Sequence, residues 1–183
     1  LEIIRKIDDE YLNIETDGLK IIISTKRGEY SLNGLNSKEF PNIKMDLSTK
    51  PIKISQKISK TIINQTCFAV STQESRPILT GINMTIDNDN LICVATDSYR
   101  LAKKIVKLDE IRTETTNIVI PGKNLLELSK ILEDEEKNLE LHIFPTNVLI
   151  KTENMLFQSR LLNGSYPDTS KLIPTDFELT ITL

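Results

Sequence analysis

The sequence predicts an α+β protein built from repeated domains, each with two helices packed on antiparallel sheets. Three observations lead to this prediction: an internal repeat, short strands of alternating or continuous apolar residues, and two amphipathic helices within one copy of the repeat. With 183 residues, 39% of them hydrophobic and 27% charged, the chain has the composition of a globular protein. Its apolar runs stay well below the ~20 residues that cross a bilayer, so we expect no membrane partner.

The repeat is visible as the same order of elements in two copies: helix, strand, turn, strand, turn, strand and an aromatic-proline turn. Helical Leu1-Glu2-Ile3 resembles Leu126-Glu127-Leu128, and Arg5 then falls opposite Lys130. Strand positions match at an offset of 127 residues, in the pairs Leu12 and Leu139, Ile14 and Leu141, Ile21 and Val148, Ile23 and Ile150, Tyr30 and Phe157. The turns Phe40-Pro41-Asn42 and Tyr166-Pro167-Asp168 match at 126.

A third copy begins at the end of the chain, where Leu179, Ile181 and Thr182 correspond to Ile52, Ile54 and Ser55. The chain also begins directly with an amphipathic helical pattern, which indicates a cut rather than a natural start. We therefore expect the C-terminal part of one domain at residues 1–48, a complete central domain at 49–174 and the first strand of a third domain at 175–183.

Within the complete copy, Pro51 to Ile54 is expected to form a strand, and Ser55 to cap a helix that runs to about Gln65. An apolar stripe of Ile54, Ile58 and Ile62 should be buried. A parallel stripe about one residue away consists of Lys53, Lys57, Lys60 and Asn64. This helix should bury one side and offer lysines on the other.

A half-buried strand is expected over Ile82 to Ile86, a turn over Asp87 to Asn90 and an apolar strand over Leu91 to Ala95. The polar turn Thr96-Asp97-Ser98 then presents Tyr99, Arg100 and Leu101. Further strands are expected at Lys103 to Leu108 and Asn117 to Ile120.

Pro121 opens a second helix whose buried positions should be Leu125, Leu128 and Leu132. Lys123 and Lys130 lie seven residues apart on it, with Glu127 between them. Three strands should finish the copy, at Leu139 to Phe144, Val148 to Thr152 and Met155 to Leu161.

The charges are unevenly distributed. The net charge is −3, yet no acidic residue occurs between Leu47 and Gln73, where four lysines fall. A compact acidic run occupies Glu133 to Glu136. A protein that is acidic overall can still carry one basic face, and the local field is what attracts phosphate. The lysines are equally compatible with a solvated face that binds nothing.

The sequence does not favour catalysis or a metal site. Cys67, Cys93 and His142 are too few and too scattered for metal ligation, so both cysteines are expected to be buried and reduced in a cytoplasmic protein. Four aspartates that could gather magnesium lie in turn-like tetrads where aspartate is common for local reasons: Asp87, Asp89, Asp97 and Asp168. We therefore expect no enzyme activity and no cofactor.

Three segments occur together in one family. RPILTGINM (76–84), ATDSYRLA (95–102) and LLNGSYPDTSKLIP (161–174) resemble the bacterial DNA sliding clamp, the β subunit of DNA polymerase III, in order and rough spacing. The resemblance covers essentially the whole chain, which corresponds to the middle of that protein. It implies a clamp fold with three domains per chain, two chains per ring and helices lining the hole. Such a ring slides on duplex DNA without sequence preference and keeps the replicative polymerase on its template.

The resemblance also implies two sites. A pocket for short peptides of the polymerase, the clamp loader and repair proteins corresponds to Leu79, Thr96, Ser98, Tyr99, Arg100, Leu101, Pro167, Lys171 and Leu172. The expected DNA-facing residues are Arg5, Lys53, Lys57, Lys60, Gln73, Lys123 and Lys130. Ser98-Tyr99 stands where many relatives have glycine-histidine or serine-histidine, and Pro77 and Ile78 replace aromatic residues of some members. An alternative from another class is a peptide-binding scaffold of repeated domains that never meets DNA.

Overall fold

The computed structural model describes residues 2–40 and 47–173, and the chain divides into two compact units, Leu1–Lys44 and Met45–Leu183. The expected third-copy strand at Leu179 to Thr182 and the turn residues Pro41 and Asn42 lie outside the described residues. Each unit is treated by itself below.

The first unit is a short helix followed by one small sheet. Its elements are α1 (Glu2–Lys6), β1 (Asn13–Asp17), β2 (Lys20–Ser24), β3 (Glu29–Asn33) and a 3-10 turn at Ser37–Glu39. The strands form an antiparallel sheet in the order β1-β2-β3. Of the residues described in this unit only Ile23 is buried, so apolar side chains such as Tyr30 and Leu32 face solvent.

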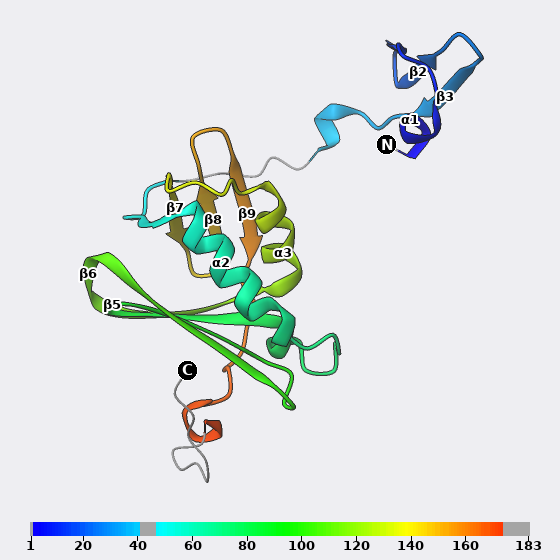
Figure 1. The fold of residues 1–183 in the computed structure, drawn as a ribbon. Helices are drawn as coiled ribbons and strands as arrows, with labels where there is room; N and C mark the ends of the chain where they lie inside the picture. Colours follow the sequence, from blue (N-terminus) through cyan, green and yellow to red (C-terminus); the bar gives the residue numbers. More distant parts are fainter. Residues whose placement is uncertain (1, 41–46, 174–183) are drawn as a thin grey trace. The chain divides into compact units, whose positions relative to one another are not determined.

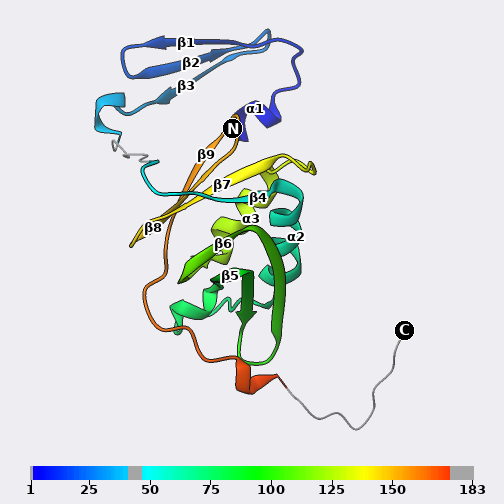
Figure 2. The same cartoon turned by 90° about the vertical axis from the view of Figure 1, so that its left-hand side faces the viewer.

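The described residues of the second unit, 47–173, form two helices and two sheets (Figure 1). Its helices are α2 (Gln56–Thr66) and α3 (Gly122–Ile131); its strands are β4 (Ile52–Ser55), β5 (Gly81–Thr96), β6 (Leu101–Pro121), β7 (Asn138–Ile143), β8 (Asn147–Lys151) and β9 (Leu156–Arg160); its 3-10 turns are Cys67–Ala69, Pro77–Thr80 and Ser170–Leu172. One antiparallel sheet has the order β4-β7-β8-β9, and the other pairs β5 with β6. Figures 1 and 2 show the two helices side by side on one side of the four-stranded sheet. The predicted α+β class is confirmed.

The two units share a strand register. Ile14 pairs with Ile23 in the first unit, and 127 residues later Leu141 pairs with Ile150 in the second. The next ladder repeats in the same way: Ile23 pairs with Tyr30 and Ile150 with Phe157. Since β2 and β3 also have the same bounds as β8 and β9 after this offset, the repeat predicted from apolar residues extends to the backbone pairing.

Helix α2 begins as predicted. The Ser55 side chain accepts a hydrogen bond from the backbone N–H of Ile58 at 3.2 Å, which satisfies one of the free amides of the first turn. The predicted apolar stripe is wrong for one of its three members. Ile54, which belongs to β4, and Ile62 are buried at 8% and 2% exposure, whereas Ile58 is 36% exposed. Ile63, which was not predicted, is buried at 2%. Because Ile54 precedes the cap, it cannot set the phase of the helix.

The turn expected at Asp87 to Asn90 does not separate two strands. The structure assigns one strand, β5, from Gly81 to Thr96, with register shifts against β6 on either side of Asn88. Asn88 has a φ of 53°, a left-handed conformation that asparagine tolerates better than most residues. The turn-forming residues therefore produce an irregularity within a strand. β6 is likewise one strand, from Leu101 to Pro121, where two had been expected.

The core lies between the helices and the sheets. Its fully buried members include Ile82, Leu91 and Ile120 from the β5–β6 pair and Leu125 and Leu128 from α3. The stripe predicted for α3 is confirmed, because Leu132 is also only 3% exposed. Cys67 and Cys93 are free and buried in the same core, as predicted, and burial raises the pKa of Cys93 to about 12.

Candidate functional site

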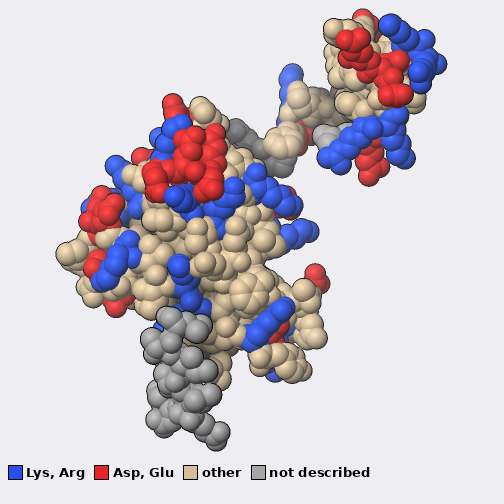
Figure 3. Space-filling view, in the orientation of Figure 1, with Lys and Arg blue, Asp and Glu red and all other residues tan. Residues whose placement is uncertain are grey.

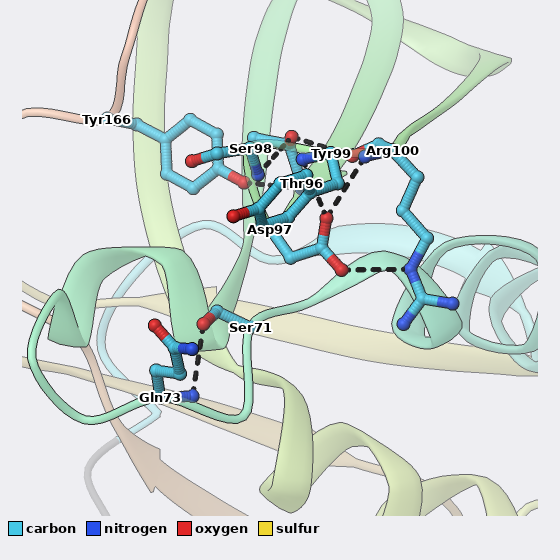
Figure 4. A network of polar contacts seen from close by, with 8 residues as sticks. All are labelled: Ser71, Gln73, Thr96, Asp97, Ser98, Tyr99, Arg100 and Tyr166. Carbon is cyan, nitrogen blue, oxygen red and sulfur yellow. Dashed lines mark hydrogen bonds and ion pairs between the residues drawn. The ribbon is translucent and has the colours of Figure 1, made fainter.

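The connection between β5 and β6 is a loop that is held by its own side chains (Figure 4). The Thr96 hydroxyl donates to the Arg100 carbonyl at 2.7 Å and accepts from the Ser98 N–H at 3.1 Å. One oxygen of the Asp97 carboxylate accepts from the N–H groups of Tyr99 and Arg100, each at 3.0 Å. Ser98 takes the left-handed conformation, with a φ of 79°. These four bonds are all made within residues 96–100.

The Asp97 carboxylate is the centre of this loop. Its second oxygen lies 2.9 Å from Nε of Arg100. The two backbone N–H donors, and then the Arg100 guanidinium, hold the pKa of Asp97 below its usual value. The charged carboxylate thus directs Arg100, whose guanidinium carbon also lies 6.0 Å from the centre of the Phe68 ring.

A second segment, after β9, is attached to this loop. The hydroxyl oxygen of Tyr166 accepts a hydrogen bond from the backbone N–H of Thr96 at 3.0 Å (Figure 4). Burial raises the pKa of the Tyr166 hydroxyl. Further back, the Leu162 N–H donates to the Val119 carbonyl at 2.8 Å. Tyr166 therefore brings the segment that contains Pro167 to the end of β5.

The structure places the nine predicted pocket residues in two groups. Leu79 and Thr96 are buried, at 3% and 4% exposure, and Leu101 is half-buried, so these three lie at or below the surface. The others are exposed, with Tyr99 at 97%; they are Ser98, Tyr99, Arg100, Pro167, Lys171 and Leu172. The Tyr166 hydrogen bond joins Thr96 to the segment that contains Pro167. Among the described residues, no hydrogen bond joins Leu172 to the β5–β6 loop.

The sequence analysis missed Phe68 at this surface. Its ring is 58% exposed and lies beneath the Arg100 guanidinium. The available signal was its place four residues after Asn64, a polar residue of α2, although Phe68 itself lies in the 3-10 turn Cys67–Ala69 that follows the helix. A large exposed aromatic ring beside an arginine is the kind of residue that anchors binding partners.

The lysines of the helices gather at one end of the helix pair. Lys60 Nζ donates to the Leu132 carbonyl at 3.3 Å, and at the other end of the pair Cys67 Sγ lies 3.6 Å from the Gly122 carbonyl oxygen, so the helices run antiparallel. Lys57 Nζ lies 3.1 Å from Oε1 of Glu136, and Lys130 Nζ lies 2.7 Å from Oε1 of Glu127. Figure 3 shows the acidic side chains and the neighbouring basic ones over the segment that joins α3 to β7.

The other predicted DNA-facing residues are more scattered. Lys123 is exposed at the opposite end of α3, where Cys67 Sγ lies 3.6 Å from the Gly122 carbonyl. Lys53 is exposed on β4, and Gln73 is exposed in the loop after α2, where its N–H donates to the Ser71 hydroxyl at 3.0 Å. Arg5 is exposed on α1 in the first unit.

His142 is buried on β7. It is 3% exposed, and its Nδ1 lies 3.0 Å from the Thr49 carbonyl oxygen. The same nitrogen also lies 3.2 Å from the Thr49 hydroxyl oxygen. In the part of the chain that the structure describes, no group of three histidine, cysteine, aspartate or glutamate residues could hold a metal. No helix over residues 2–40 and 47–173 is long and apolar enough to span a membrane.

A cleft of about 540 Å³ in the second unit includes none of the predicted site residues. It lies where β4 and β7 approach β6, and Arg112 lines it together with Phe144 and Leu162. The Arg112 guanidinium donates to the backbone carbonyls of Lys50 and Pro51. This arginine ties β6 to the start of β4, which explains its half-buried position.

Comparison with known proteins identifies the family. The profile described as "DNA polymerase III beta subunit, central domain" matches residues 53–168. The beta sliding clamp of Bacillus subtilis is 45% identical over 181 residues, which are 98% of this chain and 48% of that protein. The beta sliding clamp of Staphylococcus aureus is 39% identical over 184 residues, again 48% of its length. The chain thus spans about half the length of the curated relatives it matches.

Solved structures agree with the sequence matches. The crystal structure of the DNA polymerase sliding clamp from Bacillus subtilis superposes with a TM-score of 0.82 over 96% of this chain and 46% of that one. The DNA polymerase III beta chain of Streptococcus pneumoniae, 36% identical, gives a TM-score of 0.80 over 96% of this chain and 47% of that one. The family that the three sequence segments indicated is therefore confirmed: this chain belongs to the DNA polymerase III beta subunit family of sliding clamps.

Proposed function

We propose that the chain is the middle part of a ring-shaped processivity clamp that encircles duplex DNA, slides along it and tethers the replicative polymerase. It would contain the end of a first domain at 1–48, a central domain at 49–174 and the start of a third at 175–183. Support comes from the register that recurs after 127 residues, because tandem copies of one backbone are what a ring of similar domains requires. The full-length protein would be a homodimer in the cytoplasm, without catalytic activity or cofactor.

The observation that carries the DNA-binding part is the helix pair with its lysines. Lys57, Lys60 and Lys130 lie at one end of the pair and Lys123 lies at the other, so both ends of α3 carry a basic side chain. Lysine contacts to phosphates carry no sequence information, and such contacts allow a protein to move along the duplex. Lys53, Gln73 and Arg5 would add contacts of the same kind.

The test of this function uses the full-length protein on closed circular and linear duplexes. A ring loaded onto circles should remain bound when the salt concentration is raised, and it should run off linear molecules through their ends. A repeated-domain scaffold that does not bind DNA would be retained on neither. Equal retention on circles and on linear DNA would contradict encirclement.

We also propose that the β5–β6 loop and the segment after Tyr166 receive short peptides of polymerase, clamp-loader and repair proteins. Leu101, Pro167 and Leu172 would supply apolar contacts, and Arg100, held by Asp97, would orient the peptide. The remaining members of this surface would be Leu79, Thr96, Ser98, Tyr99 and Lys171.

Alanine substitution tests this peptide surface. Arg100→Ala or Leu101→Ala should weaken the binding of a polymerase tail peptide at least tenfold, about 1.4 kcal/mol. Lys103→Ala, which removes an exposed cation from the same strand, β6, is the matched control and should leave the affinity within about twofold. An unchanged affinity in both site variants would show that the peptide binds elsewhere.

A further inference from the structure

The segment between α3 and β7 places four carboxylates at the start of α2. It is fixed there by three hydrogen bonds that involve its backbone. The Gln56 N–H donates to the Lys137 carbonyl at 2.9 Å, and the Lys57 N–H donates to the Glu135 carbonyl at 3.1 Å. In return the Glu133 N–H donates to the Gln56 side-chain oxygen at 3.1 Å, and Gln56 is 6% exposed. The acidic run Glu133 to Glu136 therefore cannot move away without uncapping the helix.

This segment engages the two lysines that α2 would offer to DNA. The Glu136 carboxylate lies 3.1 Å from Lys57 Nζ, and the Leu132 carbonyl accepts from Lys60 Nζ. The hydrogen bond and the charge of Glu136 raise the pKa of Lys57, with a smaller contribution from Asp134. Lys57 is thus a cation whose preferred partner in the free protein is a carboxylate of its own chain.

A DNA phosphate would need the same lysine. The N-terminus of a helix carries a partial positive charge that favours anions, so phosphates and the acidic run are drawn to one place. The side chains of Lys57 and Glu136 are 54% and 70% exposed, and an ion pair in water is weak enough for a phosphate to displace it. The competition should therefore reduce affinity severalfold without preventing binding.

We propose that Glu136 competes with DNA phosphates for Lys57 and thereby limits how tightly the helix face of the clamp holds duplex. This inference rests on the proposed function. A clamp that must slide gains from phosphate contacts that are weak and quickly exchanged. The acidic run would act as an internal substitute for phosphate when Lys57 moves from one backbone position to the next.

The test measures the affinity of the full-length protein for a short fluorescent duplex, at salt concentrations between about 50 and 200 mM. Glu136→Gln should tighten duplex binding about three- to tenfold at ~0.1 M salt. It should also make the slope of log K against the log of the salt concentration more negative, by about 0.9 for each lysine that is freed from the acidic run to contact a phosphate. In a Lys57→Gln background the same substitution should give less than half of that gain on a logarithmic scale. Glu114→Gln, which removes one exposed carboxylate from β6, is the charge-matched control and should change affinity less than twofold.

The outcomes separate this inference from the function on which it rests. If the wild-type protein binds duplex with a salt dependence but Glu136→Gln is unchanged, or gains equally with and without Lys57, competition is refuted and the clamp function stands. If the wild-type protein shows no salt-dependent binding to duplex, the proposed function fails and the inference fails with it.

Discussion

Tyr166→Phe removes one oxygen from the bond between the β5–β6 loop and the segment that follows β9. That oxygen accepts from the Thr96 N–H at 3.0 Å, and Thr96 is 4% exposed, so water does not readily replace it. A buried donor left without a partner costs about 1–3 kcal/mol. If the cost falls on local opening, hydrogen exchange of the Thr96 amide should accelerate by about 5- to 150-fold.

Hydrogen exchange followed by NMR on the full-length protein measures this change directly. Tyr99→Phe removes a hydroxyl from a ring that is 97% exposed, and it should leave the Thr96 amide unaffected. If the protection of Thr96 in Tyr166→Phe equals that of the wild type, the bond does not fix the segment, and the assembly of the peptide surface from two segments must be abandoned.

Other predictions concern single positions. Gly81→Ala should destabilise the protein by about 1–3 kcal/mol in urea unfolding, because a Cβ there would lie 2.7 Å from Leu162 and Val119 side-chain atoms, whereas Gly28→Ala, with nothing within 4 Å, should be close to neutral. The folded-state pKa of Asp97 is lowered, so the stabilisation that its carboxylate gives the loop should be complete above the usual aspartate pKa of 3.8 and should be lost as the pH falls through the lower folded-state pKa. The amide chemical shift of Tyr99, measured against pH, should report this loss. A loss that is already complete above pH 3.8 would contradict the lowered pKa. Cys67 and Cys93 should resist a thiol reagent at pH 8 in the native protein and react after denaturation, because burial raises their pKa to about 11 and about 12; rapid reaction of the folded protein would contradict this burial.

Local signals in the sequence were enough to locate most elements. Ser55 predicted the start of α2, and the apolar residues of β7, β8 and β9 predicted those strands to within two residues at either end. These signals work because a helix cap and an alternating strand are decided by neighbouring residues. The repeat was predictable for the same reason, since each copy carries its own local pattern.

The failures occurred where distant segments decide the outcome. Nothing near Lys57 in the sequence predicts its ion pair with Glu136, because Glu136 follows α3 and is far from Lys57 along the chain. The sequence analysis treated the lysine face and the acidic run as separate features, and the structure joins them. Asn88 shows the same limit, because pairing with β6 keeps turn-forming residues within a strand.

The strand register that the two units share has a consequence for how the chain folds. Strand β2 pairs with β3 in the same register in which β8 pairs with β9. A folding chain could therefore pair a strand of one unit with a strand of the other, which is a characteristic route to misassembly in repeat proteins. The two hairpins differ in what they require: Val148, Leu149 and Ile150 are at most 2% exposed, whereas β2 buries only Ile23. A β8–β9 hairpin in the first unit would lose the burial of these three side chains, and this loss opposes the exchange.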